Sequence, residues 1–154
     1  MITTEVNVGG LKELAGRMLT LQQADSLLRA ISTTMLAQTK DRIHEFGLNA
    51  AGSKIGTYSN RYLELRKKPV AEGGANDSDP NIRLTFTGQM QNDYSIVEIS
   101  DTEYGLGFQN QFNAQKADWV ENTYAQGGKI YALTDTELEE VRAIVAEFVA
   151  NTFK

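Results

Sequence analysis

The sequence contains no cysteine, and it has only two prolines, one histidine and one tryptophan among 154 residues. Without cysteine the chain can form no disulfide, no thiolate zinc site and no cysteine nucleophile, and this absence suits a reducing compartment. A single histidine without other histidine or cysteine ligands cannot make a recognisable metal site. We therefore expect no metal and no cofactor.

Long hydrophobic runs are also missing. No apolar stretch approaches the roughly 20 residues needed to span a bilayer, so we expect no membrane partner. The first residues lack both a basic region and an apolar region, and we predict no signal peptide. Hydrophobic residues make up 41% of the chain and charged residues 23%, which are ordinary globular values. The length fits a single domain, residues 1–154, with a substantial core.

Charge of one sign dominates each half of the chain. Residues 1–70 carry ten Lys and Arg against six Asp and Glu, whereas residues 71–154 carry five against fourteen. The halves are thus +4 and −9, and the whole chain is −5. This asymmetry would suit head-to-tail contact between copies, although two separately solvated faces would give the same pattern.

Residues for catalysis are not discernible. The nucleophile motif Gly-x-Ser-x-Gly is absent, and His44 alone would have to serve any triad. His44 falls in the last turn of a predicted helix, where we expect a surface position. The pair Glu139–Glu140 lies on a predicted solvated helix face, and turn chemistry explains Asp77 and Asp79. We predict that the protein is not an enzyme.

The N-terminal part predicts a strand over 2–8, because apolar and polar residues alternate there, and a short helix over 11–18. A long helix follows from about Asp25, and Gly47 ends it. Its predicted core face recurs at steps of three or four: Leu28, Ile31, Met35, Thr39, Ile43 and Phe46.

Residues 47–83 show no periodicity, are rich in Gly, Asn, Ser and Asp, and hold both prolines. Such a long loop is generally functional or is ordered by a partner, so we predict that it is mobile or partner-ordered. Its most basic stretch interleaves cations with apolar anchors. The candidate contacts to other subunits or to a connector are Tyr58, Arg61, Tyr62, Leu65, Arg66, Lys67 and Lys68.

The rest of the chain predicts a compact α+β unit. Residues 94–108 read as a hairpin around Asp101–Thr102, and 113–122 as a weak helix that Trp119 anchors on the sheet. Residues 130–133 read as a last strand. Thr134 and Glu137 then have the spacing of a capping box that opens a C-terminal helix. We predict an α+β fold, with a small, mostly antiparallel sheet packed by the N-terminal and C-terminal helices.

Three motifs follow one another over residues 84–137: Leu84-x-x-Thr87-Gly88-x-Met90, Lys116-Ala117-x-Trp119 and Leu133-Thr134-x-x-Glu137. This ordered set resembles the small phage virion-morphogenesis proteins, also called tail-completion or head–tail joining (neck) proteins. In that family a Leu-x-x-Thr-Gly-x-Met/Leu segment leads into a hairpin. A Tyr- or Trp-containing segment, a strand and a helix opened by Leu-Thr-x-x-Glu then follow. The resemblance covers the chain from Asp25 to its last residue. The matching residues are Leu84, Thr87, Gly88, Met90, Gly105, Gly107, Phe108, Lys116, Ala117, Trp119, Ile130, Leu133, Thr134 and Glu137.

One departure concerns residues 107–112, which stand where the family pattern often has a His-Gln/Glu-Phe-Gly-like stretch. The resemblance implies a structural virion protein without catalysis, assembled in the host cytoplasm and located in the neck or tail. It implies a ring of copies, six in number, that joins the tail tube to the head connector. DNA would pass through the lumen without specific binding, which suits an acidic chain.

A second interpretation comes from the basic segment 61–68. A small nucleic-acid-binding adaptor would use Arg61, Arg66, Lys67 and Lys68, and its affinity would fall steeply with salt. Clustered cations on one exposed face are the requirement for this function.

Overall fold

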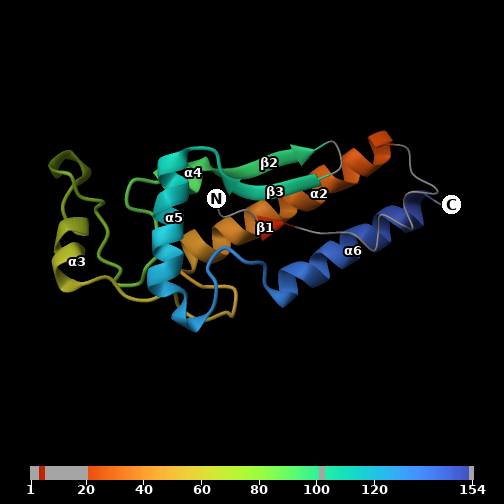
Figure 1. Ribbon diagram of the computed structural model, residues 1–154. Helices are drawn as coiled ribbons and strands as arrows, with labels where there is room; N and C mark the ends of the chain where they lie inside the picture. The colour runs from red at the N-terminus through yellow and green to blue at the C-terminus, as the bar shows by residue number, and fades with distance from the viewer. Residues whose placement is uncertain (1–3, 6–20, 101–102, 153–154) are drawn as a thin grey trace.

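The computed structural model describes residues 4–5, 21–100 and 103–152 (Figure 1). It has the predicted α+β architecture, in which helices flank a small antiparallel sheet. The predicted helix over 11–18 and most of the predicted strand over 2–8 lie outside the described residues. Within the described part, no helix has both the length and the apolar character that a bilayer crossing requires.

The predicted hairpin is confirmed. Strand β2 (Tyr94–Ser100) pairs antiparallel with β3 (Glu103–Phe108), in the order β1-β3-β2 with β1 (Thr4–Glu5) at the other edge. The register aligns Ile96 with Leu106, and an irregularity interrupts it between Glu98 and Ser100. Leu106 is buried in the core, so this short sheet supplies one wall of the hydrophobic interior.

The long N-terminal helix is also confirmed, as α2 (Leu21–Lys40) followed by one π-helical turn, η1 (Asp41–Glu45). The π-turn changes which residues face inward, because Arg42, Ile43 and His44 are all buried. Phe46, expected on the core face, is instead 67% exposed. Ile43 is buried as predicted, so the expected spacing fails only at Phe46, which follows the π-turn.

The buried Arg42 holds three segments together. Its Nε donates to Glu137 Oε1 at 2.9 Å, and its Nη1 and Nη2 atoms donate to the carbonyl oxygens of Ile130 at 2.9 Å and Ala132 at 2.8 Å. A further bond reaches the carbonyl of Leu48 at 3.2 Å. The guanidinium therefore joins the π-turn, the start of the C-terminal helix and the chain between them.

Residues 130–133 do not form the predicted strand. Hydrogen bonds to side chains replace part of the strand pairing. The Ile130 amide donates to the Glu121 carboxylate at 3.0 Å, and Arg42 donates to the carbonyl oxygens of Ile130 and Ala132. The apolar residues of this stretch pack in the core and do not pair in a sheet. Tyr131 is buried in an aromatic cluster with Tyr94 and Phe108, with ring centroids 5.4 Å from each.

The predicted weak helix over 113–122 is present as α5 (Gln111–Tyr124), which is somewhat longer. Asn110 caps it through a bond from the Phe112 amide. The buried face consists of small residues and one valine, namely Asn113, Ala114, Ala117 and Val120. Trp119 does not anchor the helix on the sheet as expected. It is 61% exposed, because the small residues at neighbouring positions take the inward face.

The capping box before α6 (Asp135–Thr152) is confirmed. The Glu137 amide donates to Thr134 Oγ1 at 3.0 Å, and the Glu137 carboxylate accepts from the Thr134 amide at 2.6 Å. The same carboxylate holds Arg42, so one buried acid caps α6 and ties it to η1. Helix α6 packs along α2 (Figure 1).

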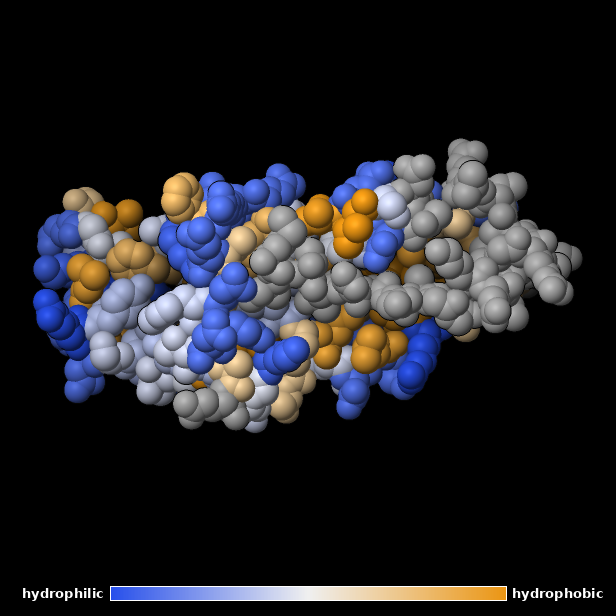
Figure 2. Space-filling model, viewed as in Figure 1, coloured by the Kyte–Doolittle hydropathy of each residue, from blue (hydrophilic) through white to orange (hydrophobic). Residues whose placement is uncertain are grey.

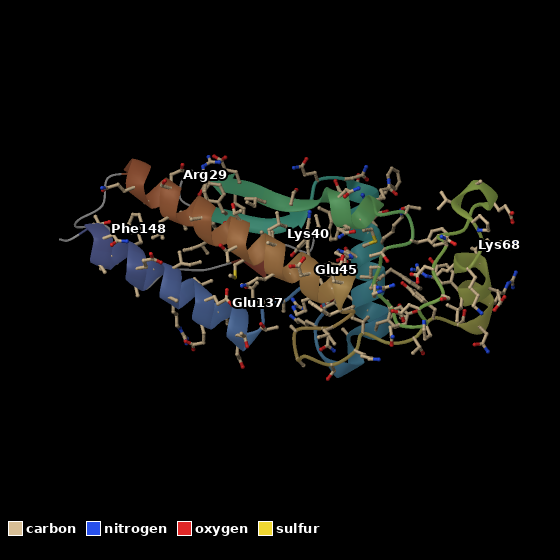
Figure 3. All side chains as sticks on the ribbon, turned by 180° about the vertical axis from the view of Figure 1, so that it is seen from behind. Arg29, Lys40, Glu45, Lys68, Glu137 and Phe148 are labelled. Atoms are coloured by element: carbon tan, nitrogen blue, oxygen red, sulfur yellow. The ribbon has the colours of Figure 1, made fainter. Side chains whose placement is uncertain are left out.

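The segment 47–83 contains two short helices, α3 (Asn60–Arg66) and η2 (Val70–Glu72), which its sequence pattern did not predict. Two bridges tie it together, between Leu48 and Lys54 and between Thr57 and Asn81. Helix α3 lies at one end of an elongated molecule (Figure 1). Figure 3 places Lys68 beyond α3 at that end and Phe148 of α6 at the other. A last short helix, α4 (Gln89–Asp93), precedes the sheet.

His44 is not the surface histidine that the sequence suggested. It is 2% exposed, and its Nδ1 lies 3.0 Å from the carbonyl oxygen of Arg83, to which it donates. Burial lowers the pKa of His44 to about 4, with a smaller contribution from the charge of Lys40. The side chain is therefore neutral in the folded protein at pH 7.

We expect acid to destabilise the protein through His44 well before the carboxylates titrate. Unfolded His44 binds a proton near pH 6.5, and folded His44 does so only near pH 4. The unfolded state therefore binds more protons between these values, and the free energy of unfolding falls with pH by about 2 kcal/mol between pH 7 and pH 5. Urea unfolding at several pH values measures the slope. In His44→Gln the slope should vanish, and an unchanged slope would contradict the assignment.

Candidate functional site

The residues singled out by sequence gather on and around α3. Ser59 caps this helix by accepting from the Tyr62 amide at 3.4 Å. Arg61, Lys67 and Lys68 are exposed, and Lys67 forms an ion pair with Glu64 at 2.6 Å. Among the apolar candidates, Tyr62 and Leu65 are the partly exposed ones, and Tyr58 is half-buried.

Arg66 differs from the other candidate cations because it is fully buried. Its guanidinium carbon lies 4.4 Å from the ring centroid of Tyr58, and its Nη2 forms an ion pair with Asp77. Burial opposes its charge, but the hydrogen bond to Asp77 and the nearby Tyr58 outweigh it, and the pKa of Arg66 is raised. Arg66 thus stabilises the segment around α3 and presents no charge to solvent.

Two tyrosines and a phenylalanine pack around Arg66. The ring centroids of Tyr58 and Tyr62 are 5.1 Å apart, and those of Tyr62 and Phe86 are 5.7 Å apart. The Tyr58 hydroxyl accepts from the Arg83 amide at 3.2 Å, which fixes its ring against residues 82–84. Burial raises the pKa of Tyr58. These rings form one wall of a cleft.

The cleft lies between this aromatic wall and α5 and has a volume of about 580 Å³. Its size falls within the range of ligand and peptide pockets. Apolar and aromatic side chains dominate its lining, and the polar side chains are few and uncharged except for one lysine. The lining residues are Tyr58, Ser59, Tyr62, Ile82, Leu84, Phe86, Thr87, Gln89, Met90, Lys116, Trp119, Val120 and Tyr124.

The backbone at the cleft is unusual at two neighbouring positions. Leu84 has φ 54° and Gly88 has φ 68°, both in the left-handed region. Gly88 tolerates this conformation, but for a branched side chain such as Leu it is strained. Strain of this kind persists where surrounding contacts impose it, and it concentrates at functional sites. The positions of Leu84 and Met90 in the lining depend on these two turns.

Sequence analysis placed Tyr58 and Tyr62 among the candidates but missed the α5 side of the cleft. Trp119 contacts Tyr124 edge-on at 6.2 Å between centroids, and Lys116 donates to Gln89 Oε1 at 3.3 Å. A usable signal was present: Phe112, Lys116 and Trp119 lie at helical spacing on the side of α5 opposite its small residues. Two large aromatics on an outward face predict a binding surface rather than a core contact.

The surface around the cleft combines apolar and hydrophilic side chains. Figure 2 shows apolar side chains exposed at the end of the molecule that carries α3, beside strongly hydrophilic ones. Val70 is 72% exposed and Phe112 is 73% exposed. Among the described residues, no group of three or more His, Asp or Glu side chains is placed to hold a metal ion. The cleft can therefore hold an apolar group of a ligand and offers that ligand polar contacts at its edge.

Comparison of the chain with protein-family models, with curated proteins and with solved structures returns no match.

Proposed function

We propose that this chain is a structural phage virion protein of the head–tail junction, where copies form a ring that joins the tail tube to the head connector. The observation that carries the proposal is the order of local structures over residues 84–137. A left-handed glycine turn at Gly88 leads through α4 into the β2–β3 hairpin, then into α5 with Lys116 and Trp119. The Thr134–Glu137 capping box then opens α6.

This order matches the motif order that resembles tail-completion proteins, apart from the departure at residues 107–112 and a further difference at 130–133. An irregular segment over 130–133, with bends at residues 130–132, takes the place of the family's strand. The proposal assigns the protein no catalysis and no cofactor, and it places the protein in the virion. The ring is expected to contain six copies, whose neighbours are the connector and tail-tube proteins. DNA would pass through the lumen, and the net charge of −5 disfavours adhesion to it.

The nucleic-acid adaptor is the weaker candidate. It needs Arg66 as one of four cations, and Arg66 is buried against Tyr58 and paired with Asp77. Lys67 is partly neutralised by Glu64. Two of the four cations, Arg61 and Lys68, have neither constraint, and two phosphate contacts give little affinity at physiological salt.

Deleting the gene from the phage or prophage that carries it tests the proposed function. We expect lysates to contain full heads and separate tails but few joined virions, because the joining ring is missing. Negative-stain electron microscopy counts the joined and separate particles. Supplying the unaltered gene in trans should restore joining. Normal numbers of joined virions in the deletion strain would overturn the proposal, and so would a gene neighbourhood without portal, connector, tail-tube or tape-measure genes.

A further inference from the structure

The outward face of α5 is aromatic and lacks exposed carboxylates. Its two acids, Asp118 and Glu121, are half-buried, and Glu121 accepts from the Ile130 amide. Lys116 is the one charged side chain among the exposed residues of this helix. Those residues are Gln111, Phe112, Gln115, Lys116, Trp119, Asn122 and Thr123. An exposed aromatic surface is typical of the binding centre of a protein interface.

The outward face of α6 is mainly acidic, whereas the only exposed charge on α5 is that of a lysine. Four carboxylates are exposed, those of Asp135, Glu139, Glu140 and Glu147, against one arginine. That arginine, Arg142, pairs with Glu139, and Glu140 accepts a hydrogen bond from Gln38 of α2. One large apolar residue is exposed among them: Leu138, at 38%. Leu138 lies in the first turns of α6, with Asp135 three residues before it and Glu139 directly after it. The start of α6 thus presents an apolar side chain flanked by acids.

We propose that the cleft of one copy receives the start of α6 from a second copy. Leu138 enters between Tyr62 and Trp119, and Asp135 beside it faces Lys116. Opposite charge at the rim favours this orientation over a contact between two clefts, which would bring two lysines together. The inference rests on the proposed function, which calls for copies in a ring, and it names the two surfaces that meet.

The contact cannot form within one copy. Helices α3, α5 and α6 follow one another along the length of the molecule, and α6 packs along α2 (Figure 1). The α6 of the same copy therefore lies on the far side of α5 from the cleft. Since the two surfaces differ, the contact is head-to-tail, and repeating it gives a closed ring or an open filament.

Cross-linking of cysteine variants tests the contact directly, because the natural chain has no cysteine to interfere. One sample carries Gln115→Cys beside Lys116, and the other carries Thr136→Cys near Leu138. We expect a short bis-maleimide to link the two in a mixture and to give little product with either variant alone. The matched control replaces Thr136→Cys with Ala71→Cys, which is exposed next to α3 and should give no excess product.

The single tryptophan gives a second readout in the unmodified protein. Trp119 is 61% exposed in the isolated chain, so its emission should shift to shorter wavelength as protein concentration rises from micromolar to millimolar. Leu138→Gln should raise the dissociation constant at least about tenfold, the loss expected when an interface anchor is removed. Ile99→Gln is the control, because Ile99 of β2 is similarly exposed, at 44%, and does not line the cleft.

Several results of these two experiments would overturn the proposed contact. Cross-linking confined to pairs of Gln115→Cys chains would overturn the proposal in favour of two clefts facing each other. Absence of any cross-link above the Ala71→Cys control would also overturn it, as would equal effects of Leu138→Gln and Ile99→Gln. These measurements use purified protein and do not depend on particle joining. A deletion strain with normal virions would therefore reject the proposed function and leave the measured contact unaffected.

Discussion

Replacing Arg42 with Met is expected to lower the free energy of unfolding by about 3–5 kcal/mol. The substitution leaves the Glu137 carboxylate buried without its cation, since the two side chains are only 9% and 6% exposed. It also removes the donors to the carbonyl oxygens of Ile130 and Ala132. An unpaired buried charge is costly because no water replaces the lost partner. A domain of this size has only about 5–15 kcal/mol of stability, so the variant should be close to unfolding.

Urea unfolding at pH 7 measures this effect, and Arg29→Met provides the matched control. Arg29 pairs with Asp25 at 2.9 Å, but its side chain is 58% exposed, so its loss should cost under about 1 kcal/mol. The double variant Arg42→Met with Glu137→Gln removes both charges and should recover part of the loss, which a double-mutant cycle quantifies. A cost for Arg42→Met no larger than for Arg29→Met would contradict the assigned role.

Local signals in the sequence predicted much of this fold. The Thr134–Glu137 capping box, the β2–β3 hairpin and the long helix α2 each depend on residues close in sequence, and the structure confirms all three. Their hydrogen bonds form between near neighbours or between two strands that lie close together in the sequence. The residue pattern therefore contains the information that these elements need.

Predictions that depended on distant contacts were less successful. Residues 130–133 have a strand-like pattern, but their partners are Arg42 and Glu121, side chains that no local rule could bring there. His44 is buried because the π-turn rotates it inward and the Arg83 carbonyl meets it. Neither the π-turn nor the partner 39 residues away can be read from helical periodicity.

The candidate site was likewise predicted where it depends on one local segment and missed where it depends on a distant one. Composition alone pointed to the basic and aromatic segment 58–68, and Tyr58 and Tyr62 do line the cleft. The opposite wall, with Trp119, comes from a helix some 50 residues later, and sequence analysis placed that residue on the sheet. Charge counting also treated Arg66 as equivalent to its neighbours, although its contact with Asp77 makes it part of the interior.

Replacing Asp77 with Asn should loosen the segment around α3 without unfolding the rest of the chain. Arg66 would keep its buried charge but lose its carboxylate, whereas the Asn side-chain oxygen could still accept from the Asp79 amide, as Asp77 does at 2.9 Å. We expect a local cost of roughly 3 kcal/mol, at the low end for a broken buried pair because Asp77 is 19% exposed. The cleft would lose the rigid support of its aromatic wall.

Amide hydrogen exchange locates this effect, because backbone hydrogen bonds join residues 75–77 to the end of α3 near Arg66. The amides of Ala75 and Asp77 both donate to the Arg66 carbonyl at 3.0 Å, and the amide of Asn76 donates to that of Lys68 at 2.9 Å. Their protection should fall about a hundredfold in Asp77→Asn, which corresponds to the expected cost, while amides of α2 stay protected. Glu64→Gln, which removes only the exposed pair with Lys67, should leave all of them unchanged. Equal protection in Asp77→Asn and the natural protein would show that Arg66 does not depend on Asp77. Uniform loss of protection, reaching α2 as well, would show instead that the segment around α3 and the sheet open as one unit.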